Sequence, residues 1–264
     1  MKSRSLQSKL FFAYISLACL ILFSFAVFFY AFVSRQLKQS QISAMNTLNS
    51  SFQTQVDSAI RNLDAVSVNI NYSNQSKTIL DNSFNLNISS NMLSAMSDLF
   101  ISLSGTELKA DQVNLYDFSG YVLEAGISTI VKKTDGSKDE WIEVARELEG
   151  KKVLTPPYCT REYTKTATYD QWFISLYRSF NNQYKRGVGV IETAKQCKSV
   201  FKSIITYKKK NHEDAASIYV FDSNGDLIYP YDISQEYKAA LQPYYELDRK
   251  STRLNSSHSE IPRM

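Results

Sequence analysis

The most apolar stretch of the chain lies close to its N-terminus. Residues Leu10–Val33 read LFFAYISLACLILFSFAVFFYAFV and contain no charged residue, glycine or proline. As an α-helix this segment would be about 36 Å long, and the hydrocarbon core of a bilayer is about 30 Å thick. The pattern therefore predicts a transmembrane helix over 10–33, with the lipid bilayer as a partner of the chain.

A cleaved signal peptide is the alternative interpretation of this segment. Its apolar region would be about 7–15 residues long and would end in small residues at a cleavage site. Residues 28–32 are instead mostly Phe and Tyr. A lipoprotein signal at Cys19 is also disfavoured, because Ser16 stands where such a signal needs an apolar residue. We expect an uncleaved anchor.

Basic residues flank the apolar segment on both sides. Those before it are Lys2, Arg4 and Lys9, without an acid among them, and those after it are Arg35 and Lys38. The positive-inside rule favours the side with more basic residues as the cytoplasmic one. We therefore expect residues 1–9 to lie in the cytoplasm and everything after the span to lie outside the cell.

Apolar residues continue beyond the span at helical spacing. They recur every three or four positions, at Ile42, Met45, Leu48, Phe52, Val56, Ile60, Leu63 and Val66. This stripe predicts a stalk helix over 34–72. The stripe is narrow enough to be the seam of a homodimer, and it could equally pack onto the chain's own domain. The pattern leaves both open.

Beyond the stalk helix the apolar spacing changes. A second amphipathic helix is expected over 92–103, with Gly105 as its C-cap. Alternating residues and turn signals then predict antiparallel hairpins around 113–123, 172–192 and 218–229. Long helices followed by hairpins indicate an α+β fold with an antiparallel sheet. The first and third hairpins share a D-x-x-G turn, which suggests two similar subdomains in series.

The formal net charge of +4 depends on an unusual C-terminal segment. Asp248–His258 reads DRKSTRLNSSH, which resembles the translation of a common sequencing-library adapter, and we interpret 248–264 as an artefactual tail. This tail has four basic and two acidic residues, so the rest of the chain carries +2. That charge is too small to indicate nucleic acid as a partner.

Histidines are too few for the common catalytic and metal sites. The chain has two, and His258 lies in the adapter-like tail. His212 is followed by two acids, as in a phospho-acceptor box, but no helical stripe surrounds it and we interpret it as a loop residue. One histidine allows neither a Ser-His-Asp triad nor a histidine-based metal cluster. We expect no catalytic residues, no metal and no cofactor.

Candidate ligand-binding residues come from the aromatic strand Trp172–Phe180, WFISLYRSF. Alternation places Arg178 on one face among apolar residues. An arginine there needs either a ligand with carboxylate or hydroxyl groups or an acid within the protein, and the sequence leaves both open. Trp141, Tyr116 and Tyr177 are further candidates, because ligand sites combine aromatic walls with a few polar groups.

Two cysteines, Cys159 and Cys197, are expected outside the membrane, where a disulfide can persist. They permit one bridge between them. Their spacing along the chain does not establish that they lie close together.

Several segments, taken in order, resemble a known family. They are SKLFFAYISL at the membrane entry, QVNLYDFSG, FISLYRSF followed by GVGVIE, and IYVFDSNGDLIYP. The ordered set resembles the sensor part of bacterial histidine kinases of the YesM type. The resemblance implies a double Cache domain outside the membrane, with a distal PAS-like sensor domain over 73–208 and a truncated membrane-proximal subdomain over 209–247.

The resemblance also implies a function, namely the extracytoplasmic ligand-sensing portion of a two-component sensor histidine kinase whose kinase region is missing from this fragment. A small extracellular solute, with saccharides as the guess from the family, would bind the distal domain of a homodimer. The full-length parent would then phosphorylate a response regulator. The alternatives are the sensor of a chemoreceptor or transmembrane transcription regulator, or an anchored solute-binding or structural module without signalling output.

Overall fold

In the computed structural model the chain forms two compact units, Met1–Thr54 and Gln55–Met264. The described residues are 6–74, 76–77, 90–105, 108–118, 120–127, 130–133, 136, 138–147, 150–160, 171–181, 187–211, 217–222, 224–234, 236–241, 243 and 245. His212, His258 and the adapter-like tail 248–264 lie outside them.

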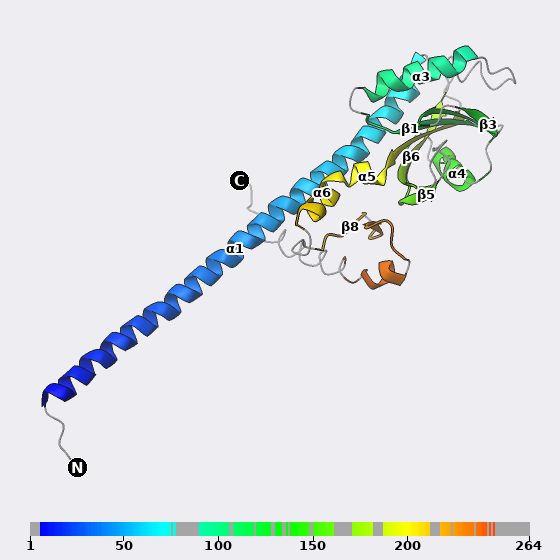
Figure 1. Ribbon diagram of the computed structural model, residues 1–264. Coiled ribbons are helices and arrows are strands. Elements are labelled where there is room, and N and C mark those ends of the chain that lie inside the picture. The colour runs from blue at the N-terminus through cyan, green and yellow to red at the C-terminus, as the bar shows by residue number, and fades with distance from the viewer. Residues whose placement is uncertain are drawn as a thin grey trace, which may run out of the picture. The chain divides into compact units, whose positions relative to one another are not determined.

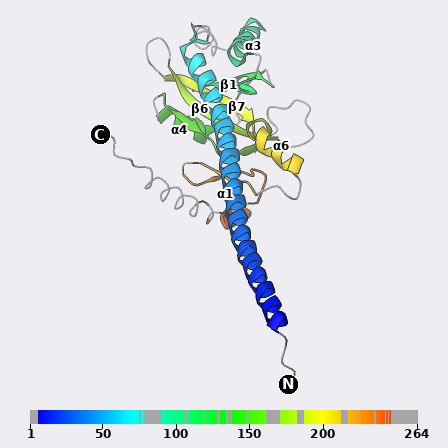
Figure 2. The same ribbon diagram turned by 90° about the vertical axis from the view of Figure 1, so that its left-hand side faces the viewer.

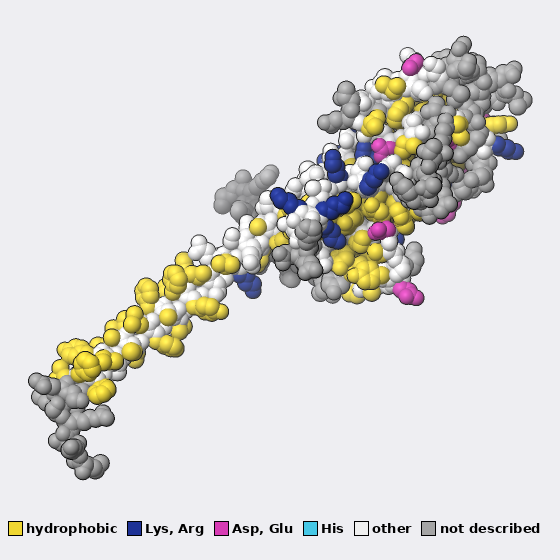
Figure 3. All heavy atoms as spheres, in the orientation of Figure 1, with side chains coloured by type: hydrophobic (Ala, Val, Ile, Leu, Met, Phe, Trp, Pro, Cys, Tyr) yellow, Lys and Arg dark blue, Asp and Glu magenta, His cyan; other side chains and the backbone are white. Residues whose placement is uncertain are grey.

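The first long element is the helix α1, Leu6–Tyr72. Among the described residues it is the one helix long and apolar enough to cross a membrane, with a mean hydropathy of 2.5 in its most apolar window. Hydrophobic side chains cover its N-terminal half (Figure 3), and those from Leu10 to Phe32 are mostly exposed. The predicted apolar helix and the predicted stalk helix are thus one continuous helix, as expected where neither glycine nor proline interrupts the sequence.

The second unit is built on one antiparallel sheet. Its strands are β1 (Gln112–Asp117), β2 (Tyr121–Gly126), β3 (Val131–Lys133), β4 (Lys152–Leu154), β5 (Tyr158–Thr160), β6 (Gln171–Asn181) and β7 (Gly187–Gln196). Their order across the described sheet is β3-β2-β1-β7-β6-β4, and β5 pairs with the same edge of β6 as β4 does. The long central strands β6 and β7 therefore hold the sheet together.

The turn of the first hairpin follows the sequence prediction. Asp117 ends β1, and its side chain accepts a hydrogen bond of 2.7 Å from the backbone N–H of Tyr121. Gly120 has φ +90°, a conformation that a residue with a Cβ rarely adopts. The D-x-x-G pattern thus closes the β1–β2 hairpin.

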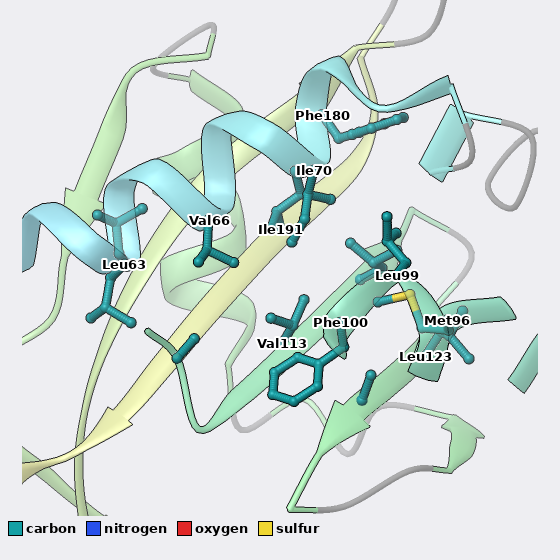
Figure 4. Close-up of a cluster of buried hydrophobic side chains, with 14 residues drawn as sticks. Leu63, Val66, Ile70, Met96, Leu99, Phe100, Val113, Leu123, Phe180 and Ile191 are labelled. Carbon is teal, nitrogen blue, oxygen red and sulfur yellow. The ribbon is translucent and has the colours of Figure 1, made fainter. Parts of the chain in front are cut away.

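One face of the sheet is covered by the last turns of α1 and by α3 (Ser90–Ser104), as Figures 1 and 2 show. Figure 4 shows Leu63, Val66 and Ile70 of α1 pointing toward the strands, with Ile191 of β7 beneath them. Burying a large aliphatic side chain of this kind contributes about 1.5–3 kcal/mol. Over residues 60–70 the stalk stripe therefore packs onto the chain's own domain, which is one of the two alternatives that its spacing allows.

The opposite face carries the short helix α4, Asp139–Glu147. Ile142 and Ala145 of α4 are buried against a second cluster that includes Tyr116, Tyr177 and Val190 from the strands. The sheet is thus packed on both sides, with α1 and α3 on one and α4 on the other. This arrangement explains why β1 has no exposed residue in any position.

After β7 the chain continues through α5 (Cys197–Val200) and α6 (Lys202–Asn211) to a small sheet of β8 (Val220–Phe221) and β9 (Leu227–Tyr229). The Asp222 side chain accepts hydrogen bonds from the backbone N–H groups of Asn224 and Asp226, and this closes the hairpin. The third predicted hairpin is therefore confirmed.

Candidate functional site

The chemistry on the α4 side of the sheet centres on Glu192 of β7. Its side chain is fully buried. In the strand register it lies between Asn114 of β1 and Tyr177 of β6. Because paired residues on neighbouring strands share a face, these three side chains lie beside one another under α4.

Within the described part of the chain, five groups from five different positions donate to the Glu192 carboxylate. They are Ser175 Oγ (2.6 Å) and Tyr158 OH (3.0 Å) to Oε1, and Tyr116 OH (2.6 Å), Asn114 Nδ2 (2.8 Å) and Lys138 Nζ (3.0 Å) to Oε2. A carboxylate offers about four lone-pair sites, so its hydrogen-bonding capacity is filled. We call this set the glutamate cluster.

The charge state of the cluster follows from these contacts. Burial alone would raise the pKa of Glu192, but the Lys138 ammonium and the hydrogen-bond donors around the carboxylate lower that pKa to about 2. Burial and the Glu192 charge raise the pKa of Tyr116 well above its ordinary value, so its hydroxyl keeps its proton. At neutral pH the cluster is a buried anion matched by one buried cation.

Aromatic rings surround this ion pair. The Lys138 ammonium lies 5.9 Å from the ring centroid of Tyr116 and 6.0 Å from that of Tyr158, within the range of cation–π attraction. Trp141 of α4 stacks on Tyr177, with ring centroids 6.5 Å apart and planes at 20°. Aromatic surface and buried polar groups therefore occur together under α4, as in sites that bind small molecules.

The structure brings together three of the four predicted ligand-binding residues. Tyr116 and Tyr177 are buried in the cluster beneath α4, and Trp141 packs against them from that helix. The same packing would be found with or without a bound solute, so it does not test the prediction. The assignment of the three residues to a ligand site therefore stays a prediction.

The fourth candidate, Arg178, lies on the other face of the sheet. It follows Tyr177 directly, and successive residues of a strand point to opposite sides. Its Nη2 donates to Asp64 Oδ1 of α1 at 2.5 Å, its Nε donates to Ser67 Oγ at 3.1 Å, and its Nη1 donates to the Gly150 carbonyl at 2.6 Å. Of the two alternatives for this arginine, the structure contains the internal acid.

Glu192 is not among the residues predicted from the sequence, although the sequence carries a signal for it. The segment GVGVIET reads as a strand of small and β-branched residues with one acid inside it. An acid within such a strand must find buried partners, because a lone buried carboxylate is costly. Its main partner, Lys138, stands 54 positions earlier in the chain and could not be paired with it by spacing.

Cys159 and Cys197 are not joined by a disulfide in the structure. Cys159 pairs with Trp172 of β6 on one side, while Cys197 follows β7, which pairs with β6 on the other. Two strands that flank a third lie about 10 Å apart, and a disulfide needs Cα atoms within about 7 Å. The bridge that the sequence permits is therefore not formed here.

The described residues contain no group of three His, Cys, Asp or Glu side chains placed to hold a metal ion. What the glutamate cluster offers chemically is binding: hydroxyl groups, an amide, an ammonium group and stacked rings, each held in a fixed orientation.

No family model matches the chain, and no curated protein matches it. Solved structures do. The extracellular domain of a protein assigned as a histidine kinase, vpHK1S-Z8, aligns with a TM-score of 0.52 at 12% identity, covering 72% of this chain and 68% of that one. A domain from Vibrio parahaemolyticus, assigned to the sensory box/GGDEF family, aligns with a TM-score of 0.51 at 13% identity, covering 73% and 72%.

At these identities the similarity shows the fold. A long N-terminal helix followed by an antiparallel sheet domain is the architecture of PAS- and Cache-like sensory domains, and this chain has it.

Proposed function

We propose that this chain is the extracytoplasmic solute-sensing portion of a membrane-bound sensor histidine kinase of the YesM type. Its fold is that of an extracellular domain assigned to a histidine kinase. Four sequence segments resemble the YesM sensors in their order along the chain. The apolar part of α1 would anchor the protein in the cell membrane, with residues 1–9 in the cytoplasm and the sheet outside.

The observation that carries this proposal is the continuity of α1. The same helix contains the candidate membrane span and, at its other end, Leu63, Val66 and Ile70 in the core of the sheet. A sensor needs a solute-binding fold joined to the membrane without a flexible linker, because a ligand acts through its differential affinity for two arrangements of the protein. A binding domain that only needs to be held at the membrane could be joined to its anchor by a flexible linker and would not require this continuous helix.

The solute is proposed to bind under α4, beside the stacked Trp141 and Tyr177. Hydroxyl-rich molecules such as saccharides suit this place, because a sugar ring packs on an aromatic face while its hydroxyl groups exchange hydrogen bonds with polar side chains. Glu192 already has its full set of donors, so the solute would meet the groups around the carboxylate, such as Lys138 and Tyr158.

The wider assembly is proposed from the resemblance. The distal sensor domain would extend over 73–208 and the truncated membrane-proximal subdomain over 209–247, with 248–264 as a foreign tail. Two copies would pair as a homodimer, for which the exposed residues Ile42 and Met45 of α1 provide apolar surface. The parent protein would pass its signal to a response regulator.

A solute screen tests the sensing role. The full chain in detergent micelles would be heated with sugars, oligosaccharides and amino acids in turn, and a saccharide is expected to raise the unfolding temperature. For a solute that does so, the Trp141→Ala variant is expected to bind about fivefold more weakly by calorimetry, since an aromatic contact is worth about 1 kcal/mol beyond its burial. Trp172→Phe, on a different cluster, is the matched control. No stabilisation by any solute would count against sensing.

The output is tested by reading the gene downstream of Leu247 from genomic DNA. A second apolar span followed by a histidine kinase region is the expected finding. A chemoreceptor signalling region or a DNA-binding domain would instead identify the parent as a chemoreceptor or a transmembrane transcription regulator. A stop codon directly after the sensor would favour an anchored module without output.

A further inference from the structure

The contacts of Arg178 join strand β6 to the helix α1. Asp64 of α1 binds two bases, Arg178 of β6 and Lys152 of β4, each at 2.5 Å. Burial alone would raise the pKa of Asp64, but hydrogen bonds and charge from Lys152 and Arg178 bring it below its usual value. Asp64 is therefore ionised at neutral pH and stays so in mildly acidic solution.

The two basic residues lie side by side on adjacent strands of the sheet. Lys152 of β4 is directly opposite Arg178 of β6 in the strand register. Like charges in opposite positions of an antiparallel pair repel each other. The Asp64 carboxylate stands between them, so the helix supplies the charge that makes this edge pair favourable.

The same strand pair leads to the candidate ligand site. Val153, next to Lys152, is opposite Tyr177 and packs in the cluster that contains Trp141. Gly150, at the start of this segment, has φ +91° and presents its carbonyl to Arg178. The segment from α4 to β4 thus has Trp141 at one end, and at the other end Gly150 and Lys152, which contact Arg178 and Asp64.

The members of this set differ in exposure. The Arg178 side chain is 13% exposed and binds three partners, whereas the Lys152 side chain is 50% exposed. A half-exposed ion pair exchanges with solvent at little cost, while a mostly buried arginine with three partners does not. Arg178 therefore fixes α1 to the sheet, and the Lys152–Asp64 ion pair is the contact that changes when β4 moves.

We propose that Asp64, Arg178 and Lys152 form an electrostatic clasp that couples the position of α4 and β4 to α1. A displacement of α4 moves β4 through Val153, changes the Lys152–Asp64 distance, and so alters how firmly α1 is held. By linkage, loosening α1 also weakens the attachment of β4 to β6. That a solute drives this displacement rests on the proposed function; the coupling itself does not.

The coupling is measured by amide hydrogen exchange on the full chain in lipid nanodiscs. Asp64→Asn is expected to speed exchange about tenfold at residues 60–68 of α1 and in β4, because two facing cations then remain unneutralised. Residues 94–104 of α3, which pack on the same face without touching the clasp, report general loosening and are expected to change much less. Lys152→Gln leaves the Arg178–Asp64 pair intact and is expected to speed exchange at residues 60–68 about three- to fivefold, which is less than the effect of Asp64→Asn. Lys151→Gln, an exposed neighbour, is the matched control and is expected to change nothing.

A double-mutant cycle gives the decisive result. Trp141→Ala is expected to speed exchange at 60–68, and this effect should shrink about threefold or more when Asp64→Asn is already present. If Trp141 and Asp64 are not coupled, the double variant would change the exchange rate by the product of the two single fold-changes. That result would overturn the proposal. If Asp64→Asn fails to fold, the cycle is run with Lys152→Gln, for which the same product rule applies.

The solute arm separates the two proposals. In one outcome, the double variant differs from the product of the single fold-changes while no solute binds in the screen. This combination would support the clasp and reject the sensing function. A solute that binds while the cycle obeys the product rule would support sensing and reject the clasp.

Discussion

Replacing Glu192 with glutamine is expected to lower the free energy of unfolding by about 3–5 kcal/mol, because it removes the counter-charge that Glu192 gives to the buried Lys138 ammonium. Ser175, Tyr116, Tyr158 and Asn114 also lose their charged acceptor. The measurement is denaturant unfolding of the full chain in micelles, followed by tryptophan fluorescence. Both tryptophans, Trp141 and Trp172, lie in the sheet unit, so the signal reports on that unit.

Two variants make this result specific. Glu143→Gln removes an acid from α4 whose partner Arg146 is also largely exposed, and it is expected to change stability by less than about 0.5 kcal/mol. Adding Lys138→Met to Glu192→Gln also removes the buried cation that Glu192 neutralised, and should recover part of the loss. A cost below about 1 kcal/mol for Glu192→Gln would contradict the view that this carboxylate organises the site.

Acid is expected to destabilise the sheet unit between pH 4.5 and pH 2. The pKa of Glu192 is about 2 in the folded protein, against an ordinary value of 4.5. In this window the unfolded chain binds the proton and the folded chain does not, so stability falls as the pH falls. The stabilisation is fully present above about pH 4.5, and a pKa difference of this size corresponds to about 3 kcal/mol. Asp64, whose pKa is also lowered, adds to the loss in the same direction.

The pH dependence is checked by repeating the denaturant unfolding at intervals from pH 6 to pH 2. The Glu192→Gln variant has no proton to take up at this position, so its stability should vary much less over the same range. Equal slopes for the two proteins would assign the acid sensitivity to other carboxylates.

Sequence patterns predicted the parts of the fold that local spacing determines. The unbroken helix, the second helix near 92–103 and the D-x-x-G hairpins depend on residues close to one another in the chain. The strands β3 and β5 were not predicted, because each is three residues long and too short to show alternation. Their position is determined by pairing with β2 and β6.

The candidate site divides in the same way. Tyr116, Tyr177 and Trp141 were chosen for their side-chain chemistry and were found together. The central acid was not, because Lys138, Tyr158 and Glu192 come from three separate segments that only the folded sheet brings into contact. For Arg178, the strand period gave the correct face but not the partner, since Asp64 lies 114 positions away on a helix.

The glutamate cluster has one carboxylate, to which its other members donate, and this makes its tolerance to substitution unequal. Removing a single donor, for example by Tyr158→Phe, leaves a carboxylate that other groups still solvate, so the cost is that of about one hydrogen bond. Glu192 itself cannot be replaced in this way, because every other member of the cluster donates to its carboxylate. Related proteins could therefore exchange the surrounding hydroxyl and ring positions one at a time, and with them the chemistry presented to a solute, while keeping the same folded framework.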